Sequence, residues 1–152
     1  MRIFFNLSLT LFFTTICLAQ NNKWVKSKSS DNLVYKTIGL FENSATKNSE
    51  LGVLGVDEGS GIRFYLYEYG FEGRPEVEFS EGSGISTIGV ILNGEHKEYP
   101  VYFTPSSLLF KKGTDFYDLI KKGGQEKIKV VVYSWRFNKY NNAMYIFQLK
   151  PQ

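Results

Sequence analysis

The chain contains one histidine, His96, which is the first side chain to consider for acid–base chemistry. It lies between Glu95 and Lys97, just beyond the dipeptide Asn93-Gly94. A general base needs a partner within hydrogen-bond reach, and a metal site needs several ligands at suitable spacing. The only cysteine is Cys17, near the N-terminus, so the mature chain offers His96 no second His or Cys ligand. The sequence predicts a solvent-exposed histidine in a hairpin, and it predicts neither a metal nor a cofactor.

Two carboxylates, Glu76 and Glu78, flank Val77. In a strand they would point to the same side about 7 Å apart, a separation that suits the acid and base of an inverting glycosidase. Alternation of Glu with Val77 and Phe79 is equally typical of any half-exposed strand. A small secreted hydrolase that uses His96 or the Glu76/Glu78 pair is therefore the alternative function, whereas a protein without enzymatic activity is the favoured one.

Tyrosine recurs at every second position in Tyr65, Tyr67 and Tyr69, with Arg63 in line. In a regular strand these four side chains share one face, opposite the apolar residues at positions 62, 64 and 66. Tyrosine has a broad apolar surface and a polar tip, which suits recognition of a sugar, a peptide or another protein. A partly covered second sheet face is the alternative, because tyrosine has a high strand preference. We predict that the four residues form a binding site in which at least two tyrosines are substantially exposed.

The charged residues are divided unevenly along the chain. Residues 20–95 contain 7 basic and 11 acidic side chains, whereas residues 96–152 contain 10 basic and 4 acidic ones. Two solvated faces that complement each other explain this division. A basic face that meets an anionic surface, such as lipid headgroups or an acidic polymer, is the alternative. No nucleic-acid-binding motif accompanies the lysines, which argues against a nucleic acid as partner.

The N-terminus, residues 1–19, has the three parts of a secretory signal peptide. Arg2 supplies the basic region, an apolar stretch follows, and small residues precede the expected cleavage after Ala19. The apolar stretch is shorter than the ~20 residues that span a bilayer, which favours cleavage over a retained anchor. Ile16 precedes Cys17, where a lipidation box requires a small residue. The expected mature chain is one domain, residues 20–152, secreted or periplasmic, with no cysteine and no transmembrane segment.

Short strand-like runs separated by Gly, Asn, Asp and Pro make up most of the mature chain, which is typical of an all-β sandwich or barrel. The strongest local signal is a hairpin at Asn93-Gly94, because both residues accept the positive φ of a type I′ turn. Pro100 lies in the second arm of this hairpin and donates no ladder hydrogen bond. This arm is therefore expected to be an edge strand or to carry a bulge near Pro100.

One short helix is expected near residues 115–122. Thr114 or Asp115 can cap it, an apolar face recurs at i, i+3 and i+4, and Gly123-Gly124 supplies its exit. Tyr133 and Trp135 either extend the tyrosine surface or fill the core. The predicted core consists of Trp24, Phe64, Leu66, Val90, Leu92, Phe116, Leu119, Ile120, Val130, Val132 and Phe147.

Several motifs in order resemble small exported bacterial β-sandwich domains. The quoted motifs are Trp24, GIRFYLYEYG, PEVEF, GVILNG, a Ser-containing run that ends in LLF, FYDLIKKGGQEKIKVVVY, and the closing MYIFQLK. This order is similar to that of the invasion-associated locus B proteins and the VasI-type accessory proteins of type VI secretion. Those groups commonly carry cysteine pairs, which the mature chain lacks. The resemblance implies a sandwich with a short helix before the last strands, and it transfers no functional residue.

These observations together predict an antiparallel β-sandwich of about eight strands with one short α-helix near residues 115–122. The predicted function is that of an exported, non-catalytic binding or accessory module of the cell envelope. Its partner is a protein or a glycan of the envelope, recognised through Arg63, Tyr65, Tyr67 and Tyr69.

Overall fold

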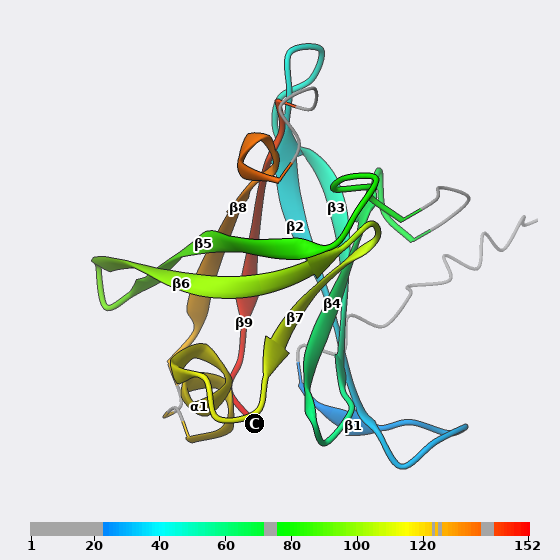
Figure 1. Cartoon of the computed structure of the whole chain (residues 1–152), viewed down its shortest axis with the longest axis vertical. Helices are drawn as coiled ribbons and strands as arrows, with labels where there is room; N and C mark the ends of the chain where they lie inside the picture. The colour runs from blue at the N-terminus through cyan, green and yellow to red at the C-terminus, as the bar shows by residue number, and fades with distance from the viewer. Residues whose placement is uncertain (1–22, 72–75, 123, 125, 138–141) are drawn as a thin grey trace, which may run out of the picture.

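Figure 1 shows a computed structural model of the chain, which describes residues 23–71, 76–122, 124, 126–137 and 142–152. The predicted signal peptide, residues 1–19, lies outside the described residues. The elements in chain order are β1 (Val25–Lys26), β2 (Leu33–Glu42), β3 (Ser49–Asp57), β4 (Gly61–Glu68), β5 (Gly84–Leu92), β6 (Glu95–Thr104), β7 (Ser107–Lys111), α1 (Asp115–Lys122), β8 (Ile128–Tyr133), the 3-10 helix η1 (Ser134–Arg136) and β9 (Met144–Leu149).

The strands form one antiparallel sheet in the order β1-β2-β3-β4-β7-β6-β5-β8-β9. A further pairing of β2 with β9 joins the two ends of this order, so eight strands close into a barrel and β1 lies outside it. In Figure 1, β5 and β6 cross in front of β8, β9 and β2. The predicted all-β antiparallel fold with one short helix is confirmed. The sheet closes on itself, however, so the predicted sandwich is replaced by a barrel.

Closure of the barrel depends on a close approach of β2 to β9. The two strands pair only from Leu40↔Ile146 to Glu42↔Met144. Next to this pairing, a Cβ atom on Gly39 would lie 2.3 Å from the carbonyl oxygen of Ile146, so only glycine fits there. Period-two alternation determines which side chains face inward, but not whether the last strand meets the first. Sequence periodicity therefore could not separate a barrel from a sandwich.

The predicted hairpin is confirmed. β5 and β6 pair from Gly84↔Phe103 to Leu92↔Glu95, and Asn93 and Gly94 between them have φ angles of 53° and 81°. These positive values are those of a type I′ turn. Within the described chain, β6 pairs with β7 only from Tyr102 to Thr104. Pro100 therefore lies where β6 has a free edge, as its missing N–H predicted.

Large side chains fill the interior of the barrel. The largest that are less than 2% exposed are Tyr145, Phe41, Phe64, Phe79, Phe110, Phe116, Phe147, Leu51, Ile62, Leu66, Ile88 and Leu108. Most of the predicted core is buried, and Trp24, Leu92 and Leu119 are partly buried against it. Aromatic side chains bury the most apolar area per residue, so this interior supplies most of the stability of the barrel.

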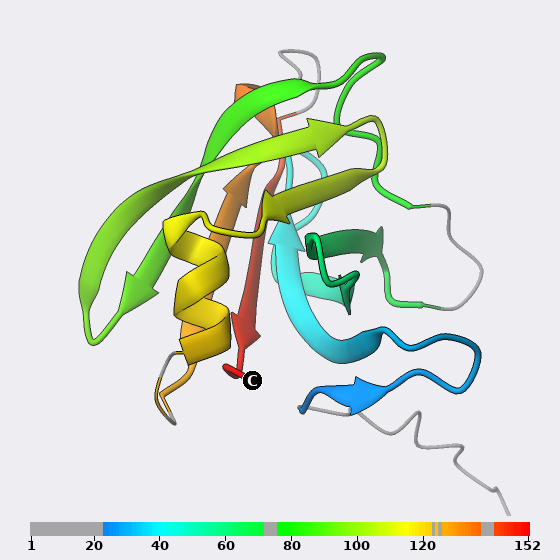
Figure 2. The same cartoon turned by 60° about the horizontal axis from the view of Figure 1, so that its bottom comes forward.

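The helix α1 spans the predicted residues and lies at the lower end of the barrel, beside the C-terminus (Figures 1 and 2). It begins after Thr114, whose carbonyl accepts the N–H of Asp118. The ring of Phe116 lies 5.4 Å from that of Tyr99 in β6 and 4.4 Å from that of Phe110 in β7. The helix thus fills the space where β6 and β7 separate. Of the predicted exit, Gly123 lies outside the described residues.

Candidate functional site

The two faces of β4 differ as the alternation predicted. Ile62, Phe64 and Leu66 are at most 1% exposed and point into the barrel. The outward side chains, Arg63, Tyr65 and Tyr67, are half-buried on the outer surface, so three of the four predicted site residues share one face. The fourth, Tyr69, lies beyond the end of the strand.

Tyr69 departs from the predicted row because the chain turns there. Its φ is 62°, and the following Gly70 has a φ of 86°. The N–H of Tyr69 donates to the carbonyl of Glu50, and its ring meets the edge of Phe41 with centroids 5.0 Å apart. It is 47% exposed, whereas Tyr65 and Tyr67 are each half-buried. Only Tyr69 is substantially exposed, so the expectation that at least two of the three tyrosines are is wrong. The glycine after Tyr69 was the local signal of this turn.

Two polar partners hold Arg63 in place. Its Nε donates to a carboxylate oxygen of Glu58 at 3.0 Å, and its Nη1 donates to Oγ of Ser107 in β7 at 2.9 Å. The arginine side chain is 20% exposed. These two hydrogen bonds hold the guanidinium close to the outer face of β4 and β7, with little freedom to reach far from the sheet.

Tyr67 packs into a small cluster with Phe71. The two ring centroids lie 5.4 Å apart, and Phe71 lies over β3 at Gly52, where a Cβ atom would be 3.2 Å from its ring. The hydroxyl of Tyr67 donates to a carboxylate oxygen of Glu76 at 3.2 Å. Burial, and then the negative charge and hydrogen bond of Glu76, raise the pKa of Tyr67 to about 12. Both partners fix this ring, so Tyr67 is mainly a structural part of the face.

Tyr65 has fewer polar contacts with described residues than Arg63 and Tyr67 have. It pairs with Leu54 across the β3–β4 ladder and is half-buried, and burial raises its pKa above the usual value of 10.0. No hydrogen bond joins its hydroxyl to another described residue. Of the three outward side chains of β4, Tyr65 is thus the one with a polar tip available for a partner.

The residues of the alternative hydrolase lie in different settings. Residues 76–80 form no regular strand, although Val77 and Phe79 are buried and Glu78 is exposed, as the alternation indicated. Glu76 is engaged by Tyr67.

His96 is exposed, as predicted, and lies in β6 opposite Ile91. Among the described residues it has no hydrogen bond to a carboxylate. The same residues contain no group of three or more His, Cys, Asp or Glu side chains that could hold a metal ion.

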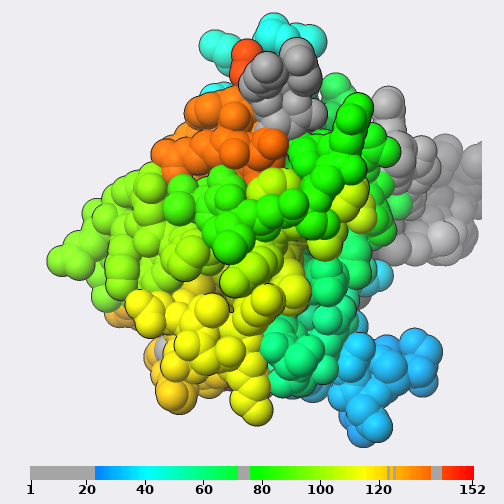
Figure 3. All heavy atoms as spheres, in the orientation of Figure 1, coloured from blue at the N-terminus to red at the C-terminus, as the bar shows by residue number. Residues whose placement is uncertain are grey.

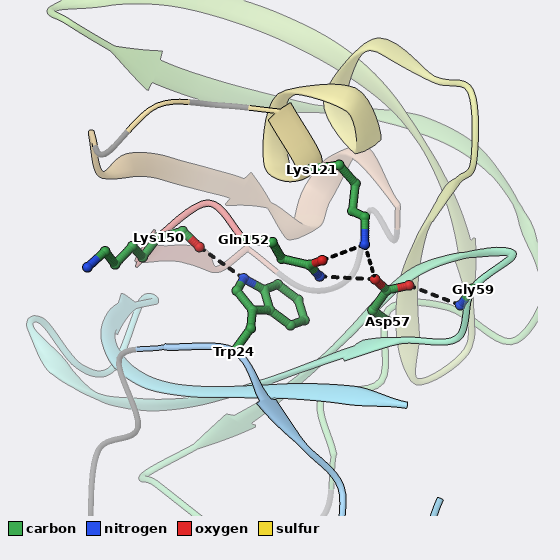
Figure 4. A network of polar contacts seen from close by, with 6 residues as sticks. All are labelled: Trp24, Asp57, Gly59, Lys121, Lys150 and Gln152. Carbon is green, nitrogen blue, oxygen red and sulfur yellow. Dashed lines mark hydrogen bonds and ion pairs between the residues drawn. The ribbon is translucent and has the colours of Figure 1, made fainter. Parts of the chain in front are cut away.

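A polar network ties α1 and the C-terminal residues to β3 at the lower end of the barrel (Figure 4). One oxygen of Asp57 accepts the N–H of Gly59 at 2.9 Å, and the other accepts Nζ of Lys121 at 2.8 Å and Nε2 of Gln152 at 3.0 Å. Burial alone would raise the pKa of Asp57, but these three donors together lower it. Because every described contact of this carboxylate is a donor that favours its charged form, it acts as a structural clamp.

Beside this network, Trp24 donates its indole N–H to the carbonyl of Lys150 at 2.9 Å (Figure 4). The backbone N–H of Lys150 in turn donates to the hydroxyl oxygen of Tyr35 at 3.2 Å. These side chains join β2 and its neighbour β1 to the end of β9, below the point where the backbones of β2 and β9 cease to pair.

The sequence left open whether Tyr133 and Trp135 extend the tyrosine surface or fill the core, and in the structure they form a second aromatic group at η1. The rings of Tyr133 and Trp135 have centroids 4.8 Å apart, and Trp135 is 45% exposed. The guanidinium carbon of Arg136 lies 5.0 Å from the Tyr133 ring, and its Nη1 donates to Glu98 at 2.6 Å and to Thr87 at 2.9 Å. We call these five residues the η1 platform. They come from η1, the end of β8, β5 and β6, so only the fold brings them together.

Comparison of the chain with known protein families, with curated proteins and with solved structures gives no match. No helix among the described residues is long and apolar enough to cross a membrane.

Proposed function

We propose that the protein is an exported, non-catalytic binding or accessory module of the cell envelope, which recognises a protein or glycan partner through the outer face of β4. The observation that carries the proposal is the division of β4, in which Phe64 is buried in the core while Tyr65 points outward and its hydroxyl has no hydrogen bond to any residue that the structure describes. A half-buried tyrosine with a polar tip gives a partner both apolar area and a hydrogen bond at low entropic cost.

Each residue of the predicted row has a distinct role in this proposal. Tyr65 makes the direct contact, and Arg63 adds a positive charge whose position Glu58 and Ser107 fix. Tyr67 supports the face from within the cluster with Phe71. Tyr69, on the rim of the barrel, contacts only a partner large enough to extend past the end of β4.

The envelope location rests on the sequence. The signal-like N-terminus and the resemblance to exported β-domains both point to secretion or to the periplasm. The exposed position of His96 and the engagement of Glu76 by Tyr67 support a binding role over the hydrolase. The proposal includes no cofactor, metal or nucleic acid.

The test is capture of envelope components by the immobilised protein and by two variants. Tyr65→Ala is expected to reduce the captured partner at least tenfold, because contact tyrosines are among the residues that dominate interfaces. Leu40→Ala is the matched control, since Leu40 is 46% exposed on β2, outside this face. Equal capture by Tyr65→Ala and the wild type would contradict the assignment of the face. Turnover of a glycoside or ester that His96→Ala abolishes would contradict the non-catalytic function.

A further inference from the structure

We propose that the η1 platform is a second binding site, separate from the face of β4, and that its ligand is an uncharged glycan chain of pyranose rings. The proposal starts from Trp135, which is 45% exposed although tryptophan carries one of the largest apolar surfaces of any side chain. The indole N–H of Trp135 has no hydrogen-bond partner among the described residues. Nearly half of this residue is therefore exposed to a ligand, and its N–H is not taken by any described acceptor.

Trp135 is exposed but held in a defined orientation. Tyr133 packs against it at 4.8 Å with the planes inclined by 54°, and Arg136 lies over the Tyr133 ring. The backbone of η1 is also tied to β5, because Oγ of Ser86 donates to the carbonyl of Arg136 at 3.3 Å. A ring held in this way loses little conformational entropy when a flat apolar surface stacks on it. The CH face of a pyranose is such a surface.

The polar part of the platform determines which ligand fits. Arg136 and Glu98 form an ion pair of 2.6 Å whose side chains are 32% and 44% exposed, and Thr87 accepts a second bond from the same guanidinium nitrogen. Together they present donors and acceptors side by side with no net charge. Sugar hydroxyls both donate and accept, so they match this arrangement. A polyanion would meet Glu98 as well as Arg136, and an apolar protein surface would have to strip water from both charges.

The surroundings of the platform favour an extended ligand. Ile85, which is 64% exposed, pairs with Tyr102 on the outer face of β5 and β6, one outward position from Thr87 along β5. Tyr102 is 37% exposed, and Nζ of Lys111 lies 3.8 Å from the centroid of its ring. Figure 3 shows the residues of η1 (orange) directly against those of β5 (green) on one broad face. A chain of several sugar rings can lie along this face, whereas a single ring would use only Trp135.

The experiment uses the two tryptophans of the chain. In a Trp24→Phe variant, Trp135 is the only tryptophan, so fluorescence reports on the platform alone. The probes are cellohexaose, chitohexaose, xylohexaose and maltohexaose. At least one is expected to change the Trp135 emission in a saturable manner. In the wild-type background, calorimetry measures the Kd for that probe, and Trp135→Ala is expected to weaken binding at least tenfold. Trp135→Phe, which keeps an aromatic ring, is expected to weaken binding less than Trp135→Ala does.

Two controls separate this site from the face of β4. Tyr65→Ala is expected to leave the Kd for the hexasaccharide within twofold, and Glu98→Gln is expected to weaken it. If Tyr65→Ala abolishes binding and Trp135→Ala does not, the glycan site on η1 is wrong while the face of β4 stands. Absence of a saturable signal with all four probes overturns the proposal. So does binding that heparin displaces and salt abolishes, because the ligand class would then be a polyanion.

Discussion

Phe64 and Tyr65 are neighbours in sequence, yet they belong to different parts of the molecule. Phe64 is 1% exposed, and its ring lies 5.9 Å from Phe110 and 5.8 Å from Phe147. Tyr65 points the other way, half-buried beside Leu54, and its hydroxyl contacts no described polar group. A strand thus gives one aromatic to the core and the next to the surface, because successive side chains point to opposite faces. The aromatic content of a strand therefore does not show which rings stabilise the core. The face of the sheet on which each ring lies does.

The same contrast applies to the whole barrel. Its interior is packed with rings from β2, β4, β7, β9 and α1, each of which contacts others of its kind. On the outside, by contrast, one group of aromatic side chains lies on β4 and a separate one lies at η1. Inner substitutions should therefore change the free energy of unfolding, and outer ones should change binding.

The largest expected effect comes from Phe64→Ala. Removing a fully buried phenylalanine costs about 3–5 kcal/mol, a large part of the 5–15 kcal/mol that stabilises a typical domain. Tyr65→Ala should cost only about 1 kcal/mol, because the ring is half-buried on the outside. Urea unfolding followed by circular dichroism measures both. Phe64→Leu, which keeps most of the volume, should fall between them. Equal losses for Phe64→Ala and Tyr65→Ala would show that the outer face is also core.

Asp57 is the one charged side chain among the buried residues that the structure describes, which makes it the second test. Its carboxylate is 6% exposed, while its partner Lys121 is 32% exposed. Asp57→Asn keeps the shape but removes the charge that Lys121 compensates, so we expect a loss of about 1–3 kcal/mol at neutral pH. Lys121→Met serves as the reciprocal variant, and a double-mutant cycle should show coupling.

The contribution of the Asp57 carboxylate to the free energy of unfolding should decrease at acidic pH. The folded pKa lies below the ordinary value of 3.8, so the stabilising effect of the carboxylate is present above pH 3.8 and is lost as the pH falls through the lowered folded pKa. The gap between the wild type and Asp57→Asn should therefore close on acidification. A gap that stays constant down to the acid transition would mean that the charge contributes nothing to the clamp.

Local patterns predicted the parts of the fold that depend on local sequence. The hairpin at Asn93-Gly94 and the helix α1 lie where turn chemistry and apolar spacing placed them. The closure of β2 on β9 was not predictable, because it depends on contacts between residues about a hundred positions apart, such as Gly39 with Ile146.

The candidate sites follow the same rule. The face of β4 could be predicted as far as Tyr67, since it arises from one regular strand. The η1 platform could not, because Arg136 meets Glu98 across 38 positions and η1 has no period-two pattern of its own. A site assembled from several strands becomes visible only when their register is known.

A smaller effect is expected from Tyr67→Phe. This variant removes the hydroxyl that donates to Glu76 at 3.2 Å and should cost about 0.5–1.5 kcal/mol at neutral pH. The raised pKa of Tyr67 means that its stabilising effect is present below pH 10.0 and is lost as the pH rises toward about 12. When the absorbance of tyrosinate is followed against pH, one tyrosine fewer should ionise near pH 12 in the variant than in the wild type. If the variant instead loses a tyrosine that ionises near the ordinary pKa of 10.0, the raised pKa of Tyr67 is contradicted.

The smallest effect on stability is expected from Tyr65→Phe, and it gives the most direct test of the comparison between the two faces. The hydroxyl of Tyr65 has no partner among the described residues, so its removal should change the free energy of unfolding by less than about 0.5 kcal/mol. Binding should respond differently, because a partner that hydrogen-bonds this hydroxyl loses that bond while the apolar contact of the ring remains. We therefore expect the affinity for the captured partner to fall about threefold to tenfold in Tyr65→Phe, and further in Tyr65→Ala. Unfolding curves and a binding isotherm on the same samples measure both quantities. A variant that loses stability but binds as the wild type does would place Tyr65 with Phe64, as part of the structure and not of the binding surface.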